Sequence, residues 1–219
     1  MGGQRPNNLA LPLQMLGLTI LGTPARSIEQ VENRPTFSKI LEDLDISQPA
    51  WQSIQRIEDL TLTNFPLLIR PSFVLSGTAM QVLKDKEALK KYLESYKLKL
   101  LGKTAATFLL TEFVEDALEL EFDTLAAEGE IIHYALSEHI EAAGIHSGDA
   151  TLVSPLRTEN KGLGIEMLQI ASKLAARFKI VGLFNIQFLY KPGKIKVIEL
   201  NLRASRSIPF VSKIHQINF

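Results

Sequence analysis

Near its C-terminus, over residues 184–207, the chain carries polar side chains in an apolar pattern that is typical of two β-strands. In the second strand Glu199, Asn201 and Arg203 recur with a period of two, so their side chains leave the same face. Gln187 lies inside the first strand. A carboxylate, amide oxygens and a guanidinium arranged in this way can hold Mg²⁺ and the phosphates of a nucleotide. An edge strand that merely alternates polar and apolar residues would give the same pattern.

The length of the turn between these strands decides whether they can share a cation. If Lys191 pairs with Ile195 across a three-residue loop, Gln187 lies directly opposite Glu199. If Pro192-Gly193 alone forms the loop, the pairing shifts by one residue and Gln187 leaves the other face. The metal-site hypothesis therefore requires the longer loop.

Composition excludes several classes of function. The 219 residues can bury a substantial core, as one large domain or two small ones. Lys plus Arg and Asp plus Glu number 24 each, so no basic field indicates nucleic acid as a partner. The sequence has no cysteine, which excludes disulfides, thiolate catalysis and cysteine-ligated zinc. No apolar run reaches the roughly 20 residues that span a bilayer. We therefore expect no membrane partner and a cytoplasmic location, with the mitochondrial matrix as the alternative.

The order of the expected elements indicates an α+β fold with two antiparallel sheets, divided near residue 104. A short helix followed by a strand at residues 18–21 resembles half of an α/β unit. Ser27 is expected to cap a helix that ends near Arg34, and a second helix covers residues 36–44. Further strands are expected over residues 65–70, 108–113, 118–126 and 131–140, and further helices over residues 85–100 and 164–178.

Other residues have both a functional and a plain interpretation. Arg70 ends an apolar strand, where it could clamp a phosphate or lie over the core as a surface arginine. Ser76-Gly77-Thr78 could close over phosphates through backbone N–H groups, although many hairpin turns look like this. Glu119 and Glu121 share one face of a strand, and one of them could accept hydrogen bonds from ribose hydroxyls. Exposed alternation explains this pair equally well.

The histidines divide into two groups. A loop with His146, Ser147 and Asp149 among glycines is typical of a segment that approaches a ligand closely. His133 and His139 share a strand face, but no third partner completes a zinc set, so a structural role is favoured. The chain has no G-x-S-x-G, Walker A or G-x-G-x-x-G motif, which argues against serine hydrolases, P-loop NTPases and Rossmann proteins.

Six motifs occur together in one order: GGQRPNN, VENRPTF, LLIRPSFVLSGTAM, SEHIEAAGIHSGDA, FNIQF and VIELNLRASRSIPFVSK. Over nearly the whole chain they resemble the C-terminal synthetase half of the carbamoyl phosphate synthetases. The resemblance implies an ATP-grasp fold over residues 28–219, preceded by a partial α/β segment over residues 1–27. Within that fold it implies a lid subdomain over about residues 46–103 and a metal- and phosphate-binding subdomain over about residues 104–219. It also implies phosphorylation of carbamate to carbamoyl phosphate with ATP and Mg²⁺ or Mn²⁺.

The resemblance assigns residues to the nucleotide. Arg34 and Arg70 match arginines that contact phosphates, and Glu119 matches a ribose-binding carboxylate. The run Glu112, Phe113 and Val114 matches the segment beside the adenine base. A second run matches a loop beside ATP and beside a monovalent-cation site that would take K⁺: Gly144, Ile145, His146 and Ser147.

The resemblance also assigns the reacting end of the site. Gln187, Glu199 and Asn201 match the divalent-metal ligands. Arg203 and Arg206 match arginines that face the transferred phosphate. With Asn201 and Arg70 they form the catalytic set that the resemblance implies.

The sequence departs from the bacterial members at two places. Ser76-Gly77-Thr78 stands where they have Gly-Gly-Arg, and Asn201-Leu202-Arg203 where they have Asn-Pro-Arg, which is closer to the eukaryotic type. The family joins a glutaminase, an N-terminal synthetase half and a regulatory domain, so the resemblance implies these domains as partners and carbamate or bicarbonate as substrate. Two rival functions remain. One is a nucleotide-binding or assembly module that is idle without its missing domains, and the other is an ATP-grasp ligase for another carboxylate.

Overall fold

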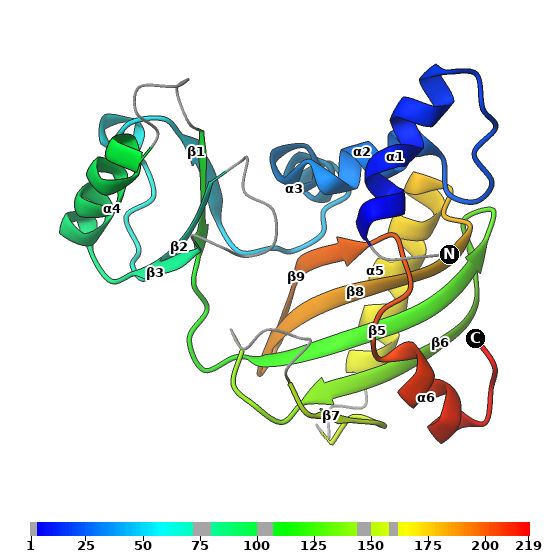
Figure 1. The fold of residues 1–219 in the computed structure, drawn as a ribbon. Helices are drawn as coiled ribbons and strands as arrows, with labels where there is room; N and C mark the ends of the chain where they lie inside the picture. Colours follow the sequence, from blue (N-terminus) through cyan, green and yellow to red (C-terminus); the bar gives the residue numbers. More distant parts are fainter. Residues whose placement is uncertain (1–3, 72–79, 100–106, 144–149, 158–161) are drawn as a thin grey trace. The chain divides into compact units, whose positions relative to one another are not determined.

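A computed structural model of the chain, drawn in Figure 1, describes residues 4–71, 80–99, 107–143, 150–157 and 162–219. Internal contacts divide the chain into two compact units, a larger one of Met1–Gln48 with Asp116–Phe219 and a smaller one of Pro49–Glu115. Each unit contains one antiparallel sheet, which confirms the α+β expectation. Among the described helices, none combines the length and the hydropathy that crossing a membrane requires.

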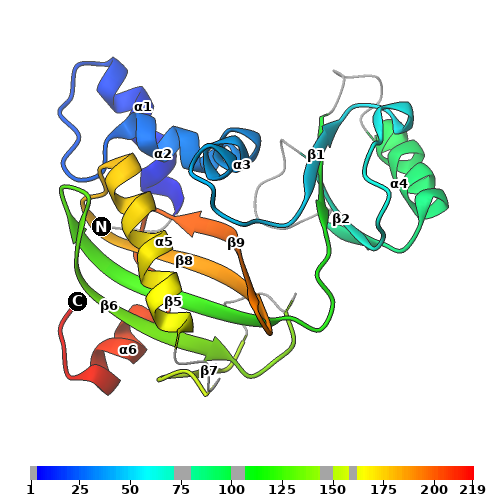
Figure 2. The same ribbon diagram turned by 180° about the vertical axis from the view of Figure 1, so that it is seen from behind.

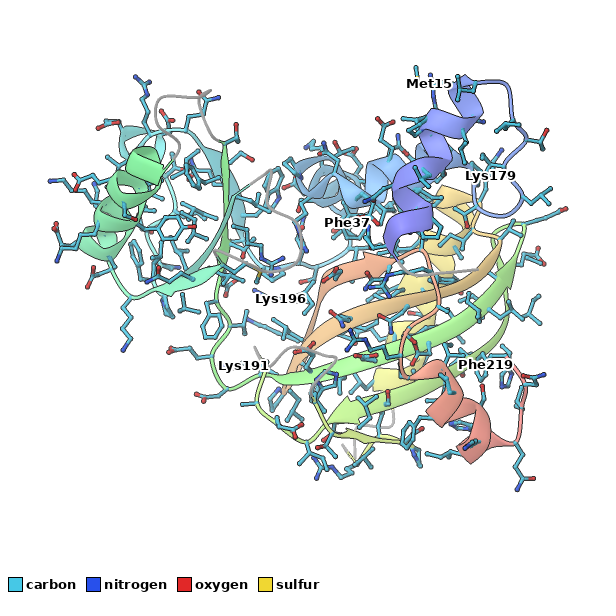
Figure 3. All side chains as sticks on the ribbon, viewed as in Figure 1. Met15, Phe37, Lys179, Lys191, Lys196 and Phe219 are labelled. Carbon is cyan, nitrogen blue, oxygen red and sulfur yellow. The ribbon has the colours of Figure 1, made fainter. Side chains whose placement is uncertain are left out.

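The larger unit is built on a five-stranded sheet with the strand order β7-β6-β5-β8-β9. Its strands are β5 (Leu118–Ala127), β6 (Glu130–His139), β7 (Leu152–Val153), β8 (Gly182–Lys191) and β9 (Lys194–Asn201). Every neighbouring pair is antiparallel. β8 and β9 form the predicted hairpin, and Lys191 lies beside its tip (Figure 3).

Helix α5 (Leu163–Phe178) covers one face of this sheet, as Figure 2 shows. Alternation in β5 explains which face it covers, because Leu120 and Phe122 are fully buried on the helix side. Ile186 and Phe188 of β8 lie directly opposite these two residues and belong to the same apolar core. The acidic residues of β5 therefore lie on the other face of the sheet.

Four further helices belong to the larger unit: α1 (Gln4–Met15), α2 (Ala25–Glu32), α3 (Arg34–Asp43) and α6 (Ile208–His215). The side chain of Asn33 caps α3 by accepting a hydrogen bond from the backbone N–H of Thr36 at 3.0 Å. This cap fixes Arg34 as the first residue of α3. Between β9 and α6 the chain crosses the sheet on the side opposite to α5 (Figures 1 and 2).

The smaller unit is a four-stranded sheet with the order β1-β4-β2-β3 and one covering helix. Its elements are β1 (Trp51–Ile54), the 3₁₀ turn η1 (Ile57–Asp59), β2 (Leu67–Pro71), β3 (Gln81–Leu83), α4 (Lys86–Lys99) and β4 (Phe108–Glu112). Asp85 accepts a hydrogen bond from the N–H of Ala88 at 2.7 Å and so stabilises the start of α4. Arg70 lies on β2, directly opposite Leu109 of β4.

Two expectations about the N-terminal half were wrong. Residues 18–21 form neither helix nor strand, and Leu21 is 91% exposed. A β-strand needs a neighbour that takes up its backbone hydrogen bonds, which apolar residues alone do not supply. Helix α2 begins at Ala25 after Pro24, so Ser27 lies inside its first turn rather than at its cap.

The division between the units also differs from the expected one near residue 104. β4 pairs with β1 and with β2, so it belongs to the smaller sheet, and that unit extends to Glu115. The sequence placed this strand with the second sheet because an apolar strand does not show which neighbours it pairs with. The assignment of the two units as lid and metal-binding subdomains remains a prediction.

Candidate functional site

Two rows of polar residues cross the face of the five-stranded sheet that is opposite to α5. The first row, in strand order from β6 to β9, consists of Ser137, Glu121, Gln187 and Glu199. The second row, from β5 to β9, consists of Asp123, Asn185 and Asn201. Because residues directly opposite each other on antiparallel strands share a face, the two rows form one polar surface.

A β-bulge in β9 produces this arrangement. Lys191 pairs with Lys194, so of the two loops considered the structure has the short Pro192-Gly193 loop, and the expectation that the metal site requires the longer loop is wrong. Phe188 still pairs with Val197, but Gln187 pairs with Glu199, and the extra residue between the two pairs is Ile198. The bulge therefore restores the opposition of Gln187 and Glu199 that the metal hypothesis requires.

Glu121 lies at the centre of the polar surface and is almost completely buried. One carboxylate oxygen, Oε1, lies 3.0 Å from Nε2 of His139 and 3.4 Å from Nε2 of Gln187. The other, Oε2, accepts a hydrogen bond from Nδ2 of Asn185 at 3.1 Å. This contact uses the amide nitrogen of Gln187, and the amide oxygen is the atom of that side chain that can bind a cation.

Asp123 forms a closed ring with two serines from the segment after β9. Ser205 and Ser207 donate to its carboxyl group at 2.5 and 2.6 Å, and their own hydroxyl oxygens are 2.8 Å apart. The three contacts link the two serines and the carboxyl group of Asp123 to one another. Burial and the charge of Glu121 raise the pKa of Asp123, against the hydrogen bonds from the two serines and Asn185.

Arginines border the metal-ligand candidates on β9. Nη2 of Arg34 lies 3.7 Å from Oε1 of Glu199, and both side chains are partly exposed. Arg203 lies beyond the end of β9, so it does not share the strand face that its spacing predicted. Its Nη2 nevertheless donates to Oδ1 of Asn201 at 3.2 Å, so the guanidinium reaches the same surface. Arg206 is exposed.

The donor set of Gln187, Glu199 and Asn201 suits a hard divalent cation, because it offers one carboxylate and two amide oxygens. In the described part of the chain there is no group of three or more His, Cys, Asp or Glu residues that could hold a metal ion. Two of the three candidate ligands are amides, and Mg²⁺ usually keeps several waters besides one or two carboxylates. The residues present therefore fit a magnesium-like ion.

The remaining predicted residues are distributed as follows. Glu119 is buried on β5, and its Oε2 lies 4.0 Å from Nδ1 of His139. Arg70 and the run Glu112–Val114 belong to the smaller unit, and their roles stay predictions. The predicted loop residues Gly144, Ile145, His146 and Ser147, and likewise Ser76-Gly77-Thr78, lie outside the described residues.

Besides Ser137 on β6, the sequence interpretation missed four members of the polar surface: Asp123, Asn185 and the two serines after β9, Ser205 and Ser207. A signal for two of them was present, because Asp123 continues the period-two acidic run of Glu119 and Glu121, and Asn185 stands two residues before Gln187. The serines carried no comparable signal, because their role depends on where the segment after β9 crosses the sheet.

His139 predicts a pH dependence of stability. Burial lowers its pKa, but the hydrogen bond to Glu121 and the charges of Glu119, Glu121 and Glu141 outweigh burial and raise it above 6.5. A histidine with a raised pKa stabilises the fold fully below its unfolded pKa, and this stabilisation is lost as pH rises through the folded pKa. The pKa of Asp123 is also raised, from its ordinary value of 3.8, so its contribution to stability likewise falls as pH rises above 3.8.

We therefore expect the free energy of unfolding to fall as pH rises above 6.5, more steeply in the parent chain than in His139→Gln. The difference in slope cannot exceed about 1.4 kcal/mol per pH unit, the limit for one proton. Urea unfolding at a series of pH values measures both slopes. Equal slopes in the two proteins would contradict the linkage.

Comparison with known proteins places the chain among related sequences. The family model for the carbamoyl-phosphate synthase L chain, ATP binding domain, matches residues 36–218. The chain is 45% identical over 224 residues to the mitochondrial carbamoyl-phosphate synthase (ammonia) of Aquarana catesbeiana. It is 42% identical over 224 residues to the carbamoyl phosphate synthase large chain of Hyperthermus butylicus. Both matches cover 100% of this chain, which spans only 15% and 20% of the two relatives.

Solved structures with low sequence identity share the fold. The biotin carboxylase domain of the 2-oxoglutarate carboxylase of Hydrogenobacter thermophilus, in complex with MgADP, ADP and bicarbonate, matches 95% of this chain with a TM-score of 0.77 at 15% identity. The match covers 48% of that domain. The D-alanine–D-alanine ligase of Bacillus anthracis with ATP matches 92% of this chain and 66% of its own length, with a TM-score of 0.68 at 17% identity. The fold is therefore ATP-grasp.

Proposed function

The chain belongs to the family of carbamoyl-phosphate synthase large-chain ATP-binding domains, and from this premise we propose that it phosphorylates carbamate with Mg-ATP. The products would be carbamoyl phosphate and ADP. The proposed site is the polar face of the five-stranded sheet. The observation that carries the proposal is the opposition of Gln187 to Glu199 and of Asn185 to Asn201, with Arg34 at 3.7 Å from Glu199.

Each side chain of this face has a proposed task. Gln187, Glu199 and Asn201 would hold Mg²⁺ or Mn²⁺, which supplies positive charge to the β- and γ-phosphates of ATP. Arg203 and Arg206 would neutralise the negative charge that spreads over the transferred phosphoryl group. Little covalent work is needed, since positioning and electrostatic stabilisation supply most of the rate enhancement in phosphoryl transfer.

Nucleotide contacts are proposed for the other residues that the family resemblance assigned. Glu119 would accept hydrogen bonds from the ribose, and Arg34 would contact phosphate beside Glu199. For Arg70 a contact with phosphate, and for Glu112–Val114 a contact with adenine, are proposed on the family resemblance alone. The ATP and K⁺ contacts that the resemblance implies for residues 144–147 stay predictions, because these residues lie outside the described ones.

Two alternatives are kept as outcomes of the test. Because the chain spans 15% of the length of its relative from Aquarana catesbeiana, it could bind nucleotide yet need further domains for turnover. Those domains, a glutaminase, a second synthetase half and a regulatory domain, are the partners we propose. The likeness to the D-alanine–D-alanine ligase favours a ligase acting on another carboxylate, but identities of 42–45% to carbamoyl-phosphate synthases favour carbamate.

The reverse reaction tests the function most directly, because carbamate itself is unstable in water. The purified chain is given Mg-ADP and carbamoyl phosphate, and the ATP formed is measured. We expect ATP formation with carbamoyl phosphate and at least about tenfold less with acetyl phosphate, since a site fitted to one substrate group discriminates by roughly this much. Calorimetry with Mg-ATP is run on the same preparation.

The outcomes separate the three functions. ATP formation from carbamoyl phosphate alone supports carbamate phosphorylation. Equal rates with acetyl phosphate would favour another carboxylate substrate. Nucleotide binding without ATP formation would favour a module that needs its partner domains, and the absence of binding by the folded chain would overturn the nucleotide site.

A further inference from the structure

The segment that carries both candidate arginines is attached to the sheet by side chains rather than by backbone pairing. Residues 202–207 form neither helix nor strand, although they connect β9 to α6. Within this segment Ser205 and Ser207 contact the carboxyl group of Asp123 at 2.5 and 2.6 Å. Both serines are therefore fixed to a residue of the central strand β5.

The carboxyl group of Asp123 is itself held rigidly. Its side chain is completely buried, and Nδ2 of Asn185 donates to its Oδ1 at 2.9 Å. Ser207 also lies 3.2 Å from Oε2 of Glu121. Because β5 is hydrogen-bonded on both sides, by β6 and by β8, the anchor cannot move without disturbing the centre of the sheet.

Arg206 stands between the two anchored serines. Ser205 is half-buried and Ser207 is buried, whereas Arg206 is exposed. Fixing the residues on both sides of Arg206 restricts the direction in which its side chain leaves the backbone. Arg203 is restrained separately, because its Nη2 donates to Oδ1 of Asn201 at 3.2 Å.

We propose that Asp123, Ser205 and Ser207 are positioning residues that hold Arg206 toward the transferred phosphate of the bound nucleotide. None of the three touches the nucleotide in this proposal, and they act through the arginine. The inference rests on the proposed function, because it takes the polar sheet face as the nucleotide site. It goes beyond that function by proposing that the hydrogen bonds among Asp123, Ser205 and Ser207 determine how well the site distinguishes ATP from ADP.

A purely structural role for the ring makes a different prediction. If the ring only satisfies a buried carboxyl group, its loss should weaken the whole fold and affect every nucleotide equally. If it positions Arg206, its loss should affect the terminal phosphate and spare the rest of the nucleotide. The comparison of Mg-ATP with Mg-ADP therefore separates the two roles.

The test uses the double variant Ser205→Ala/Ser207→Ala, which removes both hydroxyl groups and leaves the arginines in place. Calorimetry measures its affinity for Mg-ATP and for Mg-ADP. We expect Mg-ATP binding to weaken about tenfold, the effect of losing one charge-assisted contact, while Mg-ADP binding changes by less than about twofold. Ser154→Ala is the matched control, since it also removes a serine hydroxyl that bonds to the sheet, at 2.7 Å to the carbonyl of Leu136.

The coupling to Arg206 is measured by combining the variants. Arg206→Ala should show the same loss of Mg-ATP affinity, and adding the two serine substitutions to it should cause no further loss. Losses that multiply in the triple variant would overturn the proposal, as would equal weakening of Mg-ATP and Mg-ADP. Asp123→Ala removes the acceptor of both serines and should lose the preference for Mg-ATP in the same way.

Hydrogen–deuterium exchange of the backbone amides of residues 203–207, without nucleotide, tests the anchor by itself. We expect exchange about tenfold faster in the double serine variant, because opening this segment no longer breaks the ring. Unchanged exchange would overturn the anchor even if the chain binds Mg-ATP. A parent chain that binds neither nucleotide overturns the proposed function and the positioning role together, while faster exchange would still establish the anchor.

Discussion

Glu199→Ala is expected to weaken Mg-ATP binding by more than about hundredfold, because it removes the only carboxylate from the proposed metal-ligand set. Gln187 and Asn201 would remain, but neutral amides compensate poorly for the charge of a divalent cation. The substitution also leaves Arg34 without the carboxylate that lies 3.7 Å away. Calorimetric titration with Mg-ATP measures the loss.

Glu130→Ala is the matched control for this experiment. Glu130 is an exposed glutamate at the start of β6 and lies outside the two polar rows, so its removal should leave Mg-ATP affinity within about twofold. If Glu199→Ala binds Mg-ATP as tightly as the parent chain, the metal site does not lie at the bulge. Titration with ATP and excess chelator then shows whether a metal is needed at all.

Phe178→Ala is expected to lower the free energy of unfolding of the larger unit by about 3–5 kcal/mol. Phe178 is fully buried at the end of α5, its ring centroid lies 6.3 Å from that of Phe37 on α3, and the guanidinium of Arg177 lies 5.5 Å above it. Removing the ring leaves a cavity between helix and sheet that rigid neighbours fill only partly. Figure 3 marks Phe37.

Urea unfolding followed by circular dichroism measures this loss. Phe210→Ala is the control, because Phe210 is 38% exposed on α6 and its removal should change stability by less than about 0.5 kcal/mol. The effect of Phe178→Ala should fall on the transition of the larger unit only, if the two units unfold separately. A loss below about 1 kcal/mol would show that Phe178 contributes little to the packing of the apolar core.

The hairpin shows how far the sequence could lead and where it failed. The sequence left two loop lengths open and allowed Gln187 and Glu199 to face each other only with the longer one, yet they face each other across the short loop. The structure instead combines the short turn with a bulge at Ile198. A bulge is decided by local twist and by neighbouring strands, which a single strand's pattern of apolar residues does not reveal.

The polar surface was predicted only in part, for a different reason. Glu119 and Glu121 were recognised as sharing a face, yet exposed alternation explained them equally well. They are buried because His139 and the segment after β9 cover that face. A period of two shows which residues share a face of the strand. Whether that face is buried depends on which other segments of the chain pack against it.

Elements whose own pattern was strong were predicted within a few residues. β5 and α5 have clear alternation and a clear apolar stripe, and both occur where expected. Residues 18–21 failed because a strand depends on its partners more than on its own residues. The assignment of β4 to the second sheet failed for the same reason, because strand pairing depends on both segments and β4 pairs with β1 and β2.

The bulge at Ile198 also bears on how this hairpin can vary in evolution. Because of the bulge, β9 has one more residue than β8 between the turn and the pair of Gln187 with Glu199. Phe188 and Gln187 on β8 still lie on opposite faces of the sheet. A relative that lost this one residue could pair regularly and still present the carboxylate to the same face. Length differences of a single residue here are therefore compatible with an unchanged ligand set, and an alignment gap at this position is no sign of a lost site.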